Sequence, residues 1–457
     1  MAPGTSPLAG SSEPATLTGA LADLVLGTTW SDLTPQAVTV AKQCLLDWLG
    51  VTLAGSDEPL VRILLDEVAG ETQAEECSLI GFDRRVSMQN AALINGAMSH
   101  ALDFDDVITV MGHPTVPVAP ATFALGERLG ASGREVMLAF VLGVEAECRV
   151  GRLLGHSHYA RGWHGTATYG TFGAAAAAAR LWGLGRQETL HAFGLAGTQA
   201  AGLKSAFGTM AKPLHPGKSA YNGLFAARLA RRGFTSDDDI LGSAQGFAAT
   251  QSTTLNPADF LAGHPHGFYV VDALFKYHAA CYLTHDAIEA ANALRSEFGL
   301  HPDGLEQVKV RVHPTHLGVC NIQDPRTGLE CKFSLRMTTA LALAGEDTFQ
   351  DALFSDETAL RDDLVRLRDR VCVEATAEGQ GSTVEVALKD GRRLSRTVNV
   401  AVPMRDLDAQ QVKIERKFMH LAERAVGRAR ASEIAAACRD LDQLPAIGRL
   451  LEICRRD

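Results

Sequence analysis

Apolar residues recur at helical spacing through the first half of the chain. Between residues 33 and 262 they return every three or four positions, which is the period of an amphipathic helix. The segment 34–55 illustrates the pattern, because Thr34 is suited to cap a helix and Pro35 to occupy its first position. Gly-rich breaks separate further predicted helices at 87–106, 133–154, 170–181, 186–201 and 219–232.

The pattern changes after residue 266. Alternating apolar and polar residues predict strands at 305–314, 370–376 and 382–402, the last folding as a hairpin on Asp390 and Gly391. Helices are predicted between and after these strands, at 285–298, 333–343 and within 408–455.

These elements predict a mainly α protein with an α+β part. We expect a large all-helical domain built from residues 17–266 and 404–457, with a smaller α+β domain at 267–403 inserted between them. Residues 1–16 are expected to form a flexible tail. The length of 457 residues exceeds what one hydrophobic core usually covers, which also favours two domains.

Composition narrows the classes of function. Hydrophobic residues make up 46% and charged residues 21%, the ordinary mix of a soluble globular protein. The net charge of −10, without any basic tract, argues against a nucleic-acid partner. Nine scattered cysteines without a CxxC pair argue against a disulfide framework. No signal peptide and no apolar run of about 20 residues are apparent, so we expect a cytoplasmic protein that does not bind membranes.

Acidic residues gather where the predicted helix 87–106 ends. Asp103, Asp105 and Asp106 meet the negative end of the helix dipole, which is locally unfavourable, and His113 follows in the motif MGHPT. One carboxylate could therefore orient a histidine or hold a proton. The alternative is a solvated acidic loop.

His164 precedes a Gly- and Thr-rich stretch that opens an Ala-rich helix. Backbone N–H groups at such a helix start, together with Thr166, could bind a carboxylate beside His164. A histidine that merely caps a turn explains the same residues.

Cations gather in the segment AFGTMAKPLHPGKSA at 206–220. Lys212 precedes a proline, so we expect an extended or turning segment rather than a helix there. His215 and Lys218 share the segment, and a local group of cations in an acidic protein suggests a site for an anion. A solvated basic loop is the alternative.

Histidines also occur at the junction of the two predicted domains, where pockets are common. His278 is the candidate there, although His278 or His285 could equally be a satisfied core histidine. Histidine pairs elsewhere lack a third ligand, so no metal is predicted. The sequence contains no GxxxxGK[ST], GxGxxG, HExxH or GxSxG motif. It therefore gives no support for a P-loop or Rossmann nucleotide-binding protein, a zinc protease or a serine hydrolase.

Six features follow one another along the chain: DFDD, HP, a His before a small-residue helix, KPLHxG, a junction His, and GLExKFS at 328–334. In the order and spacing of these features the chain resembles the MmgE/PrpD family over nearly its whole length. The resemblance implies a helical domain with an α+β insert, a homodimer, and a pocket between domains without metal or organic cofactor. We expect Lys212, His215, Lys218 and Thr166 to bind the substrate. The implied active-site residues are Asp103, His113, His164, Lys212 and His278.

His and Lys side chains suit this chemistry. Cations are needed to bind small di- and tricarboxylates, and a side chain with a pKa near neutrality is needed to break or form a C–H bond next to a carboxylate. Our hypothesis is that Lys212 and one histidine bind carboxylates. His113, His164 or His278 would move the proton, while Asp103 orients or shares it.

The resemblance leaves the reaction open among water loss, CO2 loss and epimerisation. Val107 stands where cis-aconitate decarboxylases of the family carry Thr, HPT replaces their HPS at 113–115, and no Tyr lies between His316 and Glu330. These departures favour a lyase that dehydrates a 2-methylcitrate-like acid. A cis-aconitate decarboxylase, an epimerase or isomerase of an iminodisuccinate-like acid, and a non-catalytic carboxylate-binding protein are the alternatives.

Overall fold

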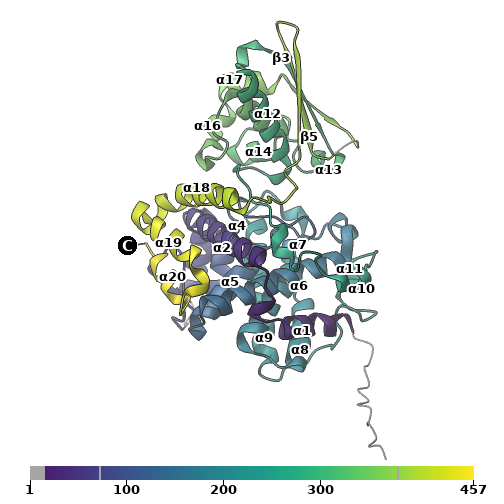
Figure 1. Ribbon diagram of the computed structural model, residues 1–457, viewed down its shortest axis with the longest axis vertical. Helices are drawn as coiled ribbons and strands as arrows, with labels where there is room; N and C mark the ends of the chain where they lie inside the picture. The colour runs from purple at the N-terminus through teal and green to yellow at the C-terminus, as the bar shows by residue number, and fades with distance from the viewer. Residues whose placement is uncertain (1–15, 71–73, 378–379, 457) are drawn as a thin grey trace, which may run out of the picture.

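Two parts of unequal size stack along the longest axis of the molecule, a helical body and a smaller α+β unit (Figure 1). The computed structural model describes residues 16–70, 74–377 and 380–456, so the predicted tail at 1–16 lies, except for its last residue, outside the described residues. Helices dominate and the main sheet has four strands, which confirms the predicted fold class.

The helical body forms where the local start signals of the sequence indicate. Thr34 accepts a hydrogen bond from the Ala37 N–H at the start of α2 (Pro35–Gly55), and Ser87 accepts one from Asn90 at the start of α4 (Met88–His100). The other helices of this part are α1 (Leu17–Gly27), α3 (Pro59–Ala69), α5 (Thr115–Leu129), α6 (Gly133–Ala160), α7 (Gly165–Trp182), α8 (Arg186–Gly197), α9 (Ala211–Ala230), α10 (Phe247–Gln251) and α11 (Pro257–Ala262).

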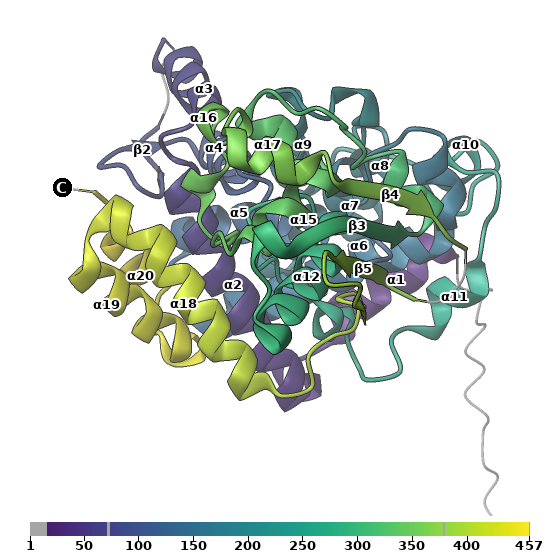
Figure 2. The same ribbon diagram turned by 90° about the horizontal axis from the view of Figure 1, so that it is seen from above.

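The last helices of the chain return to the helical body. In Figures 1 and 2, α18 (Leu407–Val426) lies beside α2; α19 (Arg428–Arg439) also contacts α2, and α20 (Gly448–Ile453) packs against α19. Gln410 of α18 donates to Gln43 of α2 at 2.7 Å within the buried contact. Distant ends of the chain therefore share one hydrophobic core.

One described helix, α2, is long and apolar enough to cross a membrane by length and composition alone. In the fold, 78% of its most apolar 18-residue stretch is buried inside the protein. It also carries the buried polar residues Gln43 and Asp47, each with a partner on α18. These features are those of a core helix.

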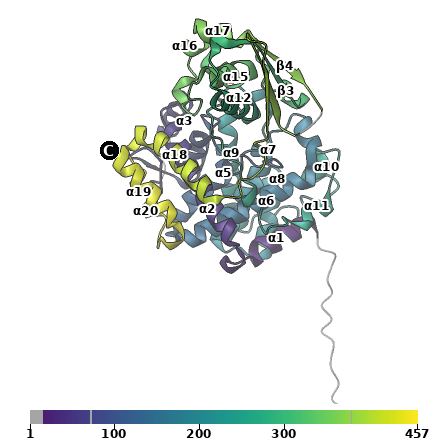
Figure 3. The same cartoon turned by 45° about the horizontal axis from the view of Figure 1, so that its top comes forward.

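The α+β unit is a mixed sheet in the order β4–β3–β5–β6 with helices packed on it (Figure 3). Its strands are β3 (Leu305–Val312), β4 (Val371–Ala375), β5 (Ser382–Leu388) and β6 (Arg393–Val398). The hairpin of β5 and β6 is confirmed, and Gly391 adopts a φ of 90° in its turn, a conformation that favours glycine. The helices include α12 (His285–Phe298), α13 (Pro314–Leu317), α14 (Gly328–Lys332), α15 (Leu335–Ala344), α16 (Asp356–Ala359) and α17 (Asp362–Arg368).

The crossing of α4 and α9 is close because two glycines meet there. A Cβ on Gly96 would lie 2.7 Å from the Cα of Gly217, and a Cβ on Gly217 would overlap the Leu93 carbonyl oxygen. The crossing matters because α9 begins one residue before Lys212, while α4 ends three residues before Asp103. Small residues at this contact therefore bring the two candidate site residues together.

Replacing Gly217 by Ala is expected to destabilise the protein by about 1–3 kcal/mol, because the added methyl group enters a filled helix contact. Urea unfolding measures the change. Gly27→Ala is the matched control, since no atom lies within 4 Å of the position its Cβ would occupy. Equal effects of the two substitutions would contradict the packing argument.

Candidate active site

The loop after α4 places three successive side chains in three different environments. Asp103 faces two lysines, Phe104 is buried in the hydrophobic core of the α+β unit, and Asp105 faces two histidines. Asp103 has a φ of 51° and is the non-glycine residue with positive φ in the described part of the chain. Such left-handed backbone is disfavoured for L-residues, and its presence here marks a constrained loop.

Asp103, Lys212 and Lys276 form a lysine–aspartate cluster. The Oδ1 of Asp103 lies 2.8 Å from Lys212 Nζ and 2.9 Å from Lys276 Nζ. Burial alone would raise the pKa of Asp103, but the two ammonium groups outweigh it and hold the pKa well below its usual range. Asp103 is therefore an ionised carboxylate between two cations.

Asp105 bridges two histidines and so fixes the orientation of their rings. Its Oδ1 lies 2.8 Å from His100 Nδ1, and its Oδ2 lies 2.7 Å from His113 Nδ1. His113 Nε2 is left 3.6 Å from Asp103 Oδ1, on the side of the lysine–aspartate cluster. Burial would raise the pKa of Asp105, but His100 and His113 lower it well below its usual range. A carboxylate that holds one imidazole nitrogen prepares the other for proton transfer.

The backbone around His113 is fixed by a close approach of two segments. The His113 N–H donates to Thr166 Oγ1 at 3.0 Å. Gly112 has a φ of 107°, and a Cβ there would lie 2.9 Å from the same hydroxyl oxygen. Thr166, predicted to bind substrate, therefore contacts the His113 backbone, which a larger residue at 112 would disturb.

His164 and His215 extend the site on its other side. Their Nδ1 atoms are 3.0 Å apart, so one ring donates a hydrogen bond to the other. The rings of His164 and His113 have centroids 6.5 Å apart, and Phe207 packs edge-on against His164. Burial, and then the charge of Lys212, holds the pKa of His164 well below its ordinary value, so its ring is neutral at neutral pH.

Lys212 lies on a helix, which corrects the predicted extended segment. It occupies the first turn of α9, followed by Pro213, and Pro216 lies one turn further on. Proline is tolerated in a first turn because the N–H groups there have no helical partner. The prediction was wrong because it treated the residue before a proline as a barrier to helix at a place where a helix can begin.

The structure brings Asp103, His113, His164, Lys212 and His215 together but leaves two predicted residues elsewhere. Lys218 is exposed, with its Nζ 4.4 Å from the Tyr221 ring centroid. The ring nitrogens of His278 contact Thr348 Oγ1 at 2.8 Å and Glu289 Oε1 at 3.2 Å, in the α+β unit.

Three members of the site were not among the predicted site residues: His100, Asp105 and Lys276. Asp105 stood in the acidic motif and could have been found from it. His100 is the last residue of α4, three positions before Asp103 of that motif. Lys276 had no local signal, because its partner Asp103 is 173 positions away.

His100, Asp103, Asp105 and His113 each offer a ligand atom within 4.8 Å of the others, a set that could hold a metal ion. The charges around it disfavour a divalent cation, because Lys212 and Lys276 both contact Asp103. Each Asp105 oxygen also already faces a histidine nitrogen. The donor set suits proton transfer better than metal binding, and a metal-independent site stays our prediction.

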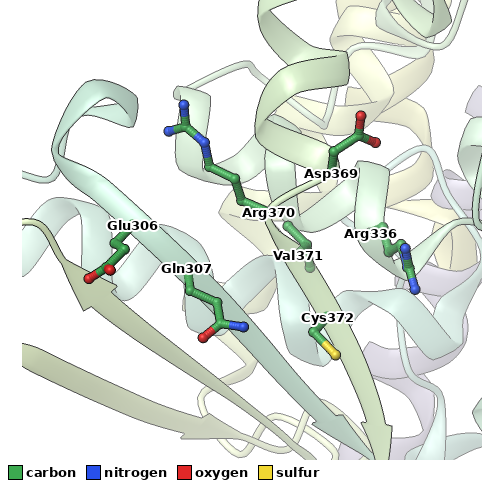
Figure 4. A pocket seen from close by; sticks show the side chains of 7 residues that line it. All are labelled: Glu306, Gln307, Arg336, Asp369, Arg370, Val371 and Cys372. Atoms are coloured by element: carbon green, nitrogen blue, oxygen red, sulfur yellow. The ribbon is translucent and has the colours of Figure 1, made fainter.

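A separate hollow of about 520 Å³ opens on the surface of the α+β unit (Figure 4). Arg370 in this hollow donates hydrogen bonds to the carbonyl oxygens of Pro302 and Leu305, so its guanidinium group stabilises the backbone at the start of β3. None of the residues lining this hollow contacts the lysine–aspartate cluster in the described part of the chain; they are Glu306, Gln307, Arg336, Asp369, Arg370, Val371 and Cys372.

The described histidines predict a loss of stability in acid. Burial lowers the pKa of His100 and of His158 to about 4, against 6.5 for an unperturbed imidazole, so the unfolded chain binds protons first as the pH falls. Burial raises the pKa of Asp106 to about 7 and also raises that of other carboxyl groups such as Glu147, an effect of opposite sign. Burial lowers the pKa of further rings as well, those of His164, His215 and His285, which adds to the effect of His100 and His158. The free energy of unfolding should therefore decrease as the pH falls from about 6.5 to about 4.

Urea unfolding at several pH values measures this dependence. His158 contacts Thr168 outside the lysine–aspartate cluster, so His158→Gln should flatten the slope by up to one proton without touching that cluster. Stability that stays constant over this range would contradict the buried neutral state of these rings.

The site combines a His–Asp pair with a Lys–Asp cluster, an arrangement suited to proton transfer. The MmgE/PrpD N-terminal domain model matches residues 19–258 and the C-terminal domain model matches 278–443, so the chain belongs to the MmgE/PrpD family. The chain is accordingly an enzyme of the MmgE/PrpD lyase type.

Curated relatives carry the names of decarboxylases. The chain is 25% identical to the cis-aconitate decarboxylase of Aspergillus terreus over 456 residues, 92% of each chain. It is 31% identical to the cis-aconitate decarboxylase-like protein oryM of Aspergillus oryzae over 285 residues, 59% of each chain. It is 30% identical to the cis-aconitate decarboxylase of Mus musculus over 313 residues, 65% of this chain and 63% of the relative.

Proposed function

We propose that the protein is a cofactor-independent lyase of small polycarboxylates, and that a cis-aconitate-like acid, which it decarboxylates, is its first candidate substrate. The observation that carries the proposal is the 2.7 Å contact of Asp105 with His113 Nδ1, which directs Nε2 toward the Lys–Asp cluster. The names of the relatives support decarboxylation in particular. The sequence-based preference for a dehydratase receives no such support and becomes the second candidate.

Lysines provide the binding energy for the substrate in this proposal. Lys212 and Lys276 share Asp103, and a substrate carboxylate approaching the cluster could take over part of either contact. The side chain of Lys212 is 10% exposed and that of Lys276 only 1%, so Lys212 is the cation that a ligand can reach. Lys276 instead keeps Asp103 in place.

His113 is the proposed proton carrier. In a decarboxylation the C–C bond to the departing carboxylate breaks, its electron pair moves into the adjacent unsaturated system, and a carbon atom takes a proton from His113 as CO2 leaves. Asp105 stabilises the imidazolium when the ring is reprotonated. The neutral His164–His215 pair supplies a hydrogen-bond donor near the substrate without adding charge.

A dehydratase acting on a 2-methylcitrate-like acid is favoured by specific residues of this chain. Val107 has no hydroxyl, and its backbone pairs with Leu274 beside the site. No Tyr lies between His316 and Glu330. In a dehydration His113 would remove a proton from carbon while the hydroxyl group leaves as water with a second proton, so the same side chains serve both reactions.

Incubation with cis-aconitate, 2-methylcitrate, citrate and iminodisuccinate in D2O, followed by NMR, tests the proposal. Decarboxylation releases CO2 and yields a five-carbon dicarboxylate carrying solvent deuterium, whereas dehydration yields new alkene signals. His113→Gln is the matched inactive variant. Turnover of no acid, combined with measurable binding, would instead favour a carboxylate-binding protein, and inversion without bond cleavage would favour an epimerase.

A further inference from the structure

We propose that Lys417, on the C-terminal helix α18, is a positioning residue for the active-site loop: its ammonium holds the Phe104 carbonyl and thereby the left-handed conformation of Asp103. The inference rests on the proposed function for its activity measurement. A second measurement, described below, does not depend on any substrate.

Lys417 makes three contacts in an environment without solvent. Its side chain is fully buried, and its Nζ donates to the Phe104 carbonyl oxygen at 2.6 Å. The same Nζ lies 2.7 Å from Asp47 Oδ1 and 4.0 Å from the centroid of the Phe104 ring. Lys417 therefore contacts both the backbone and the side chain of the residue after Asp103.

Lys276 holds the neighbouring peptide in the same manner. Its Nζ donates to the Asp103 carbonyl oxygen at 2.6 Å as well as to the Asp103 carboxylate. Two buried ammonium groups thus bind two consecutive carbonyls of the loop. This arrangement restrains the peptide planes on both sides of Phe104, and it accounts for how Asp103 keeps a φ that L-residues disfavour.

Stability alone does not explain a buried ion pair at this position. Desolvation of two charges often cancels their attraction, and a neutral pair of similar volume frequently leaves stability unchanged. Asp47 and Lys417 have side chains that are 1% and 0% exposed, so they bear this desolvation in full. The carbonyl that the pair reaches belongs to the active-site loop, which gives the pair a function that a neutral pair would lack.

The test removes both charges together. Asp47→Asn/Lys417→Met leaves no uncompensated charge in the core but deprives the Phe104 carbonyl of its donor. We expect kcat to fall on the order of 100-fold, as small displacements of reacting groups do, with KM nearly unchanged. The pair Glu145 and Arg149 is the matched control, because it is also a largely buried ion pair whose arginine donates to a carbonyl, that of Phe260.

Glu145→Gln/Arg149→Met should therefore keep kcat. Histidine NMR with labelled Cε1 provides the substrate-free measurement, since His113 faces Asp103 and its resonance, assigned with His113→Gln, should shift in the Asp47/Lys417 variant only. Wild-type kcat together with an unshifted His113 resonance would overturn the inference, as would equal losses of kcat in both double variants. If the wild-type protein turns over no acid, the proposed function fails, and the His113 resonance alone decides the role of Lys417.

Discussion

Replacing His113 by Gln is expected to lower kcat about 100- to 10,000-fold, the usual contribution of a positioned general acid or base. The reason is geometric, because Asp105 holds Nδ1 at 2.7 Å and leaves Nε2 facing Asp103. Gln retains hydrogen-bonding capacity near Asp105 but cannot carry the proton. Steady-state rates on the acid that the wild-type protein accepts, with circular dichroism to verify folding, measure the effect.

Two further histidine variants make this result specific. His156→Gln should have wild-type activity, because His156 is exposed on α6 and serves as a surface control. His278→Gln should lose less activity than His113→Gln, because both His278 nitrogens are engaged by Thr348 and Glu289. Near-wild-type turnover by His113→Gln would remove His113 from the mechanism, and a larger loss in His278→Gln would transfer the proton role to the α+β unit.

Replacing Lys276 by Met is expected to cost about 3 kcal/mol of stability, as breaking a buried ion pair generally does. The Lys276 side chain is 1% exposed and donates to both the carboxylate and the carbonyl of Asp103. Without it, Asp103 loses one of the two lysines that contact its carboxylate, so the pKa of Asp103 should rise. Urea unfolding measures the stability, and the pH dependence of that stability reports the pKa change.

A second substitution separates the charge effect from the loss of packing. Asp103→Asn/Lys276→Met removes both charges and should recover much of the lost stability while remaining inactive, since the Asp103 carboxylate is absent. Lys218→Met, at an exposed lysine on α9, should leave stability nearly unchanged. A double variant as unstable as Lys276→Met would show that packing, rather than the unpaired carboxylate, determines the cost.

Local signals in the sequence located most secondary structure. Thr34 and Ser87 cap α2 and α4 as their positions indicated, and Asp390 and Gly391 form the turn of the β5–β6 hairpin. These predictions succeed because a cap or a tight turn depends on residues within four positions. The local rule that a residue before proline is not helical failed at Lys212. A proline in the interior of a helix disrupts it, whereas a proline in the first turn, such as Pro213 of α9, is tolerated.

The sequence by itself determined that this is a mainly helical protein of the MmgE/PrpD family, and it indicated His, Asp and Lys residues as candidates for the site, because periodicity, caps and motif spacing are properties of neighbouring residues. Only the tertiary structure decided which of those side chains meet. Lys276 donates a hydrogen bond to Asp103, which is 173 positions away in the sequence, and Lys417 donates one to the carbonyl of Phe104, 313 positions away. Such pairings depend on how the α4–α9 crossing and the return of α18 bring distant backbones together, which the order of residues along the chain does not reveal. The structure likewise placed Lys276 at the cluster and His278 outside its contacts, although the two are separated by a single residue.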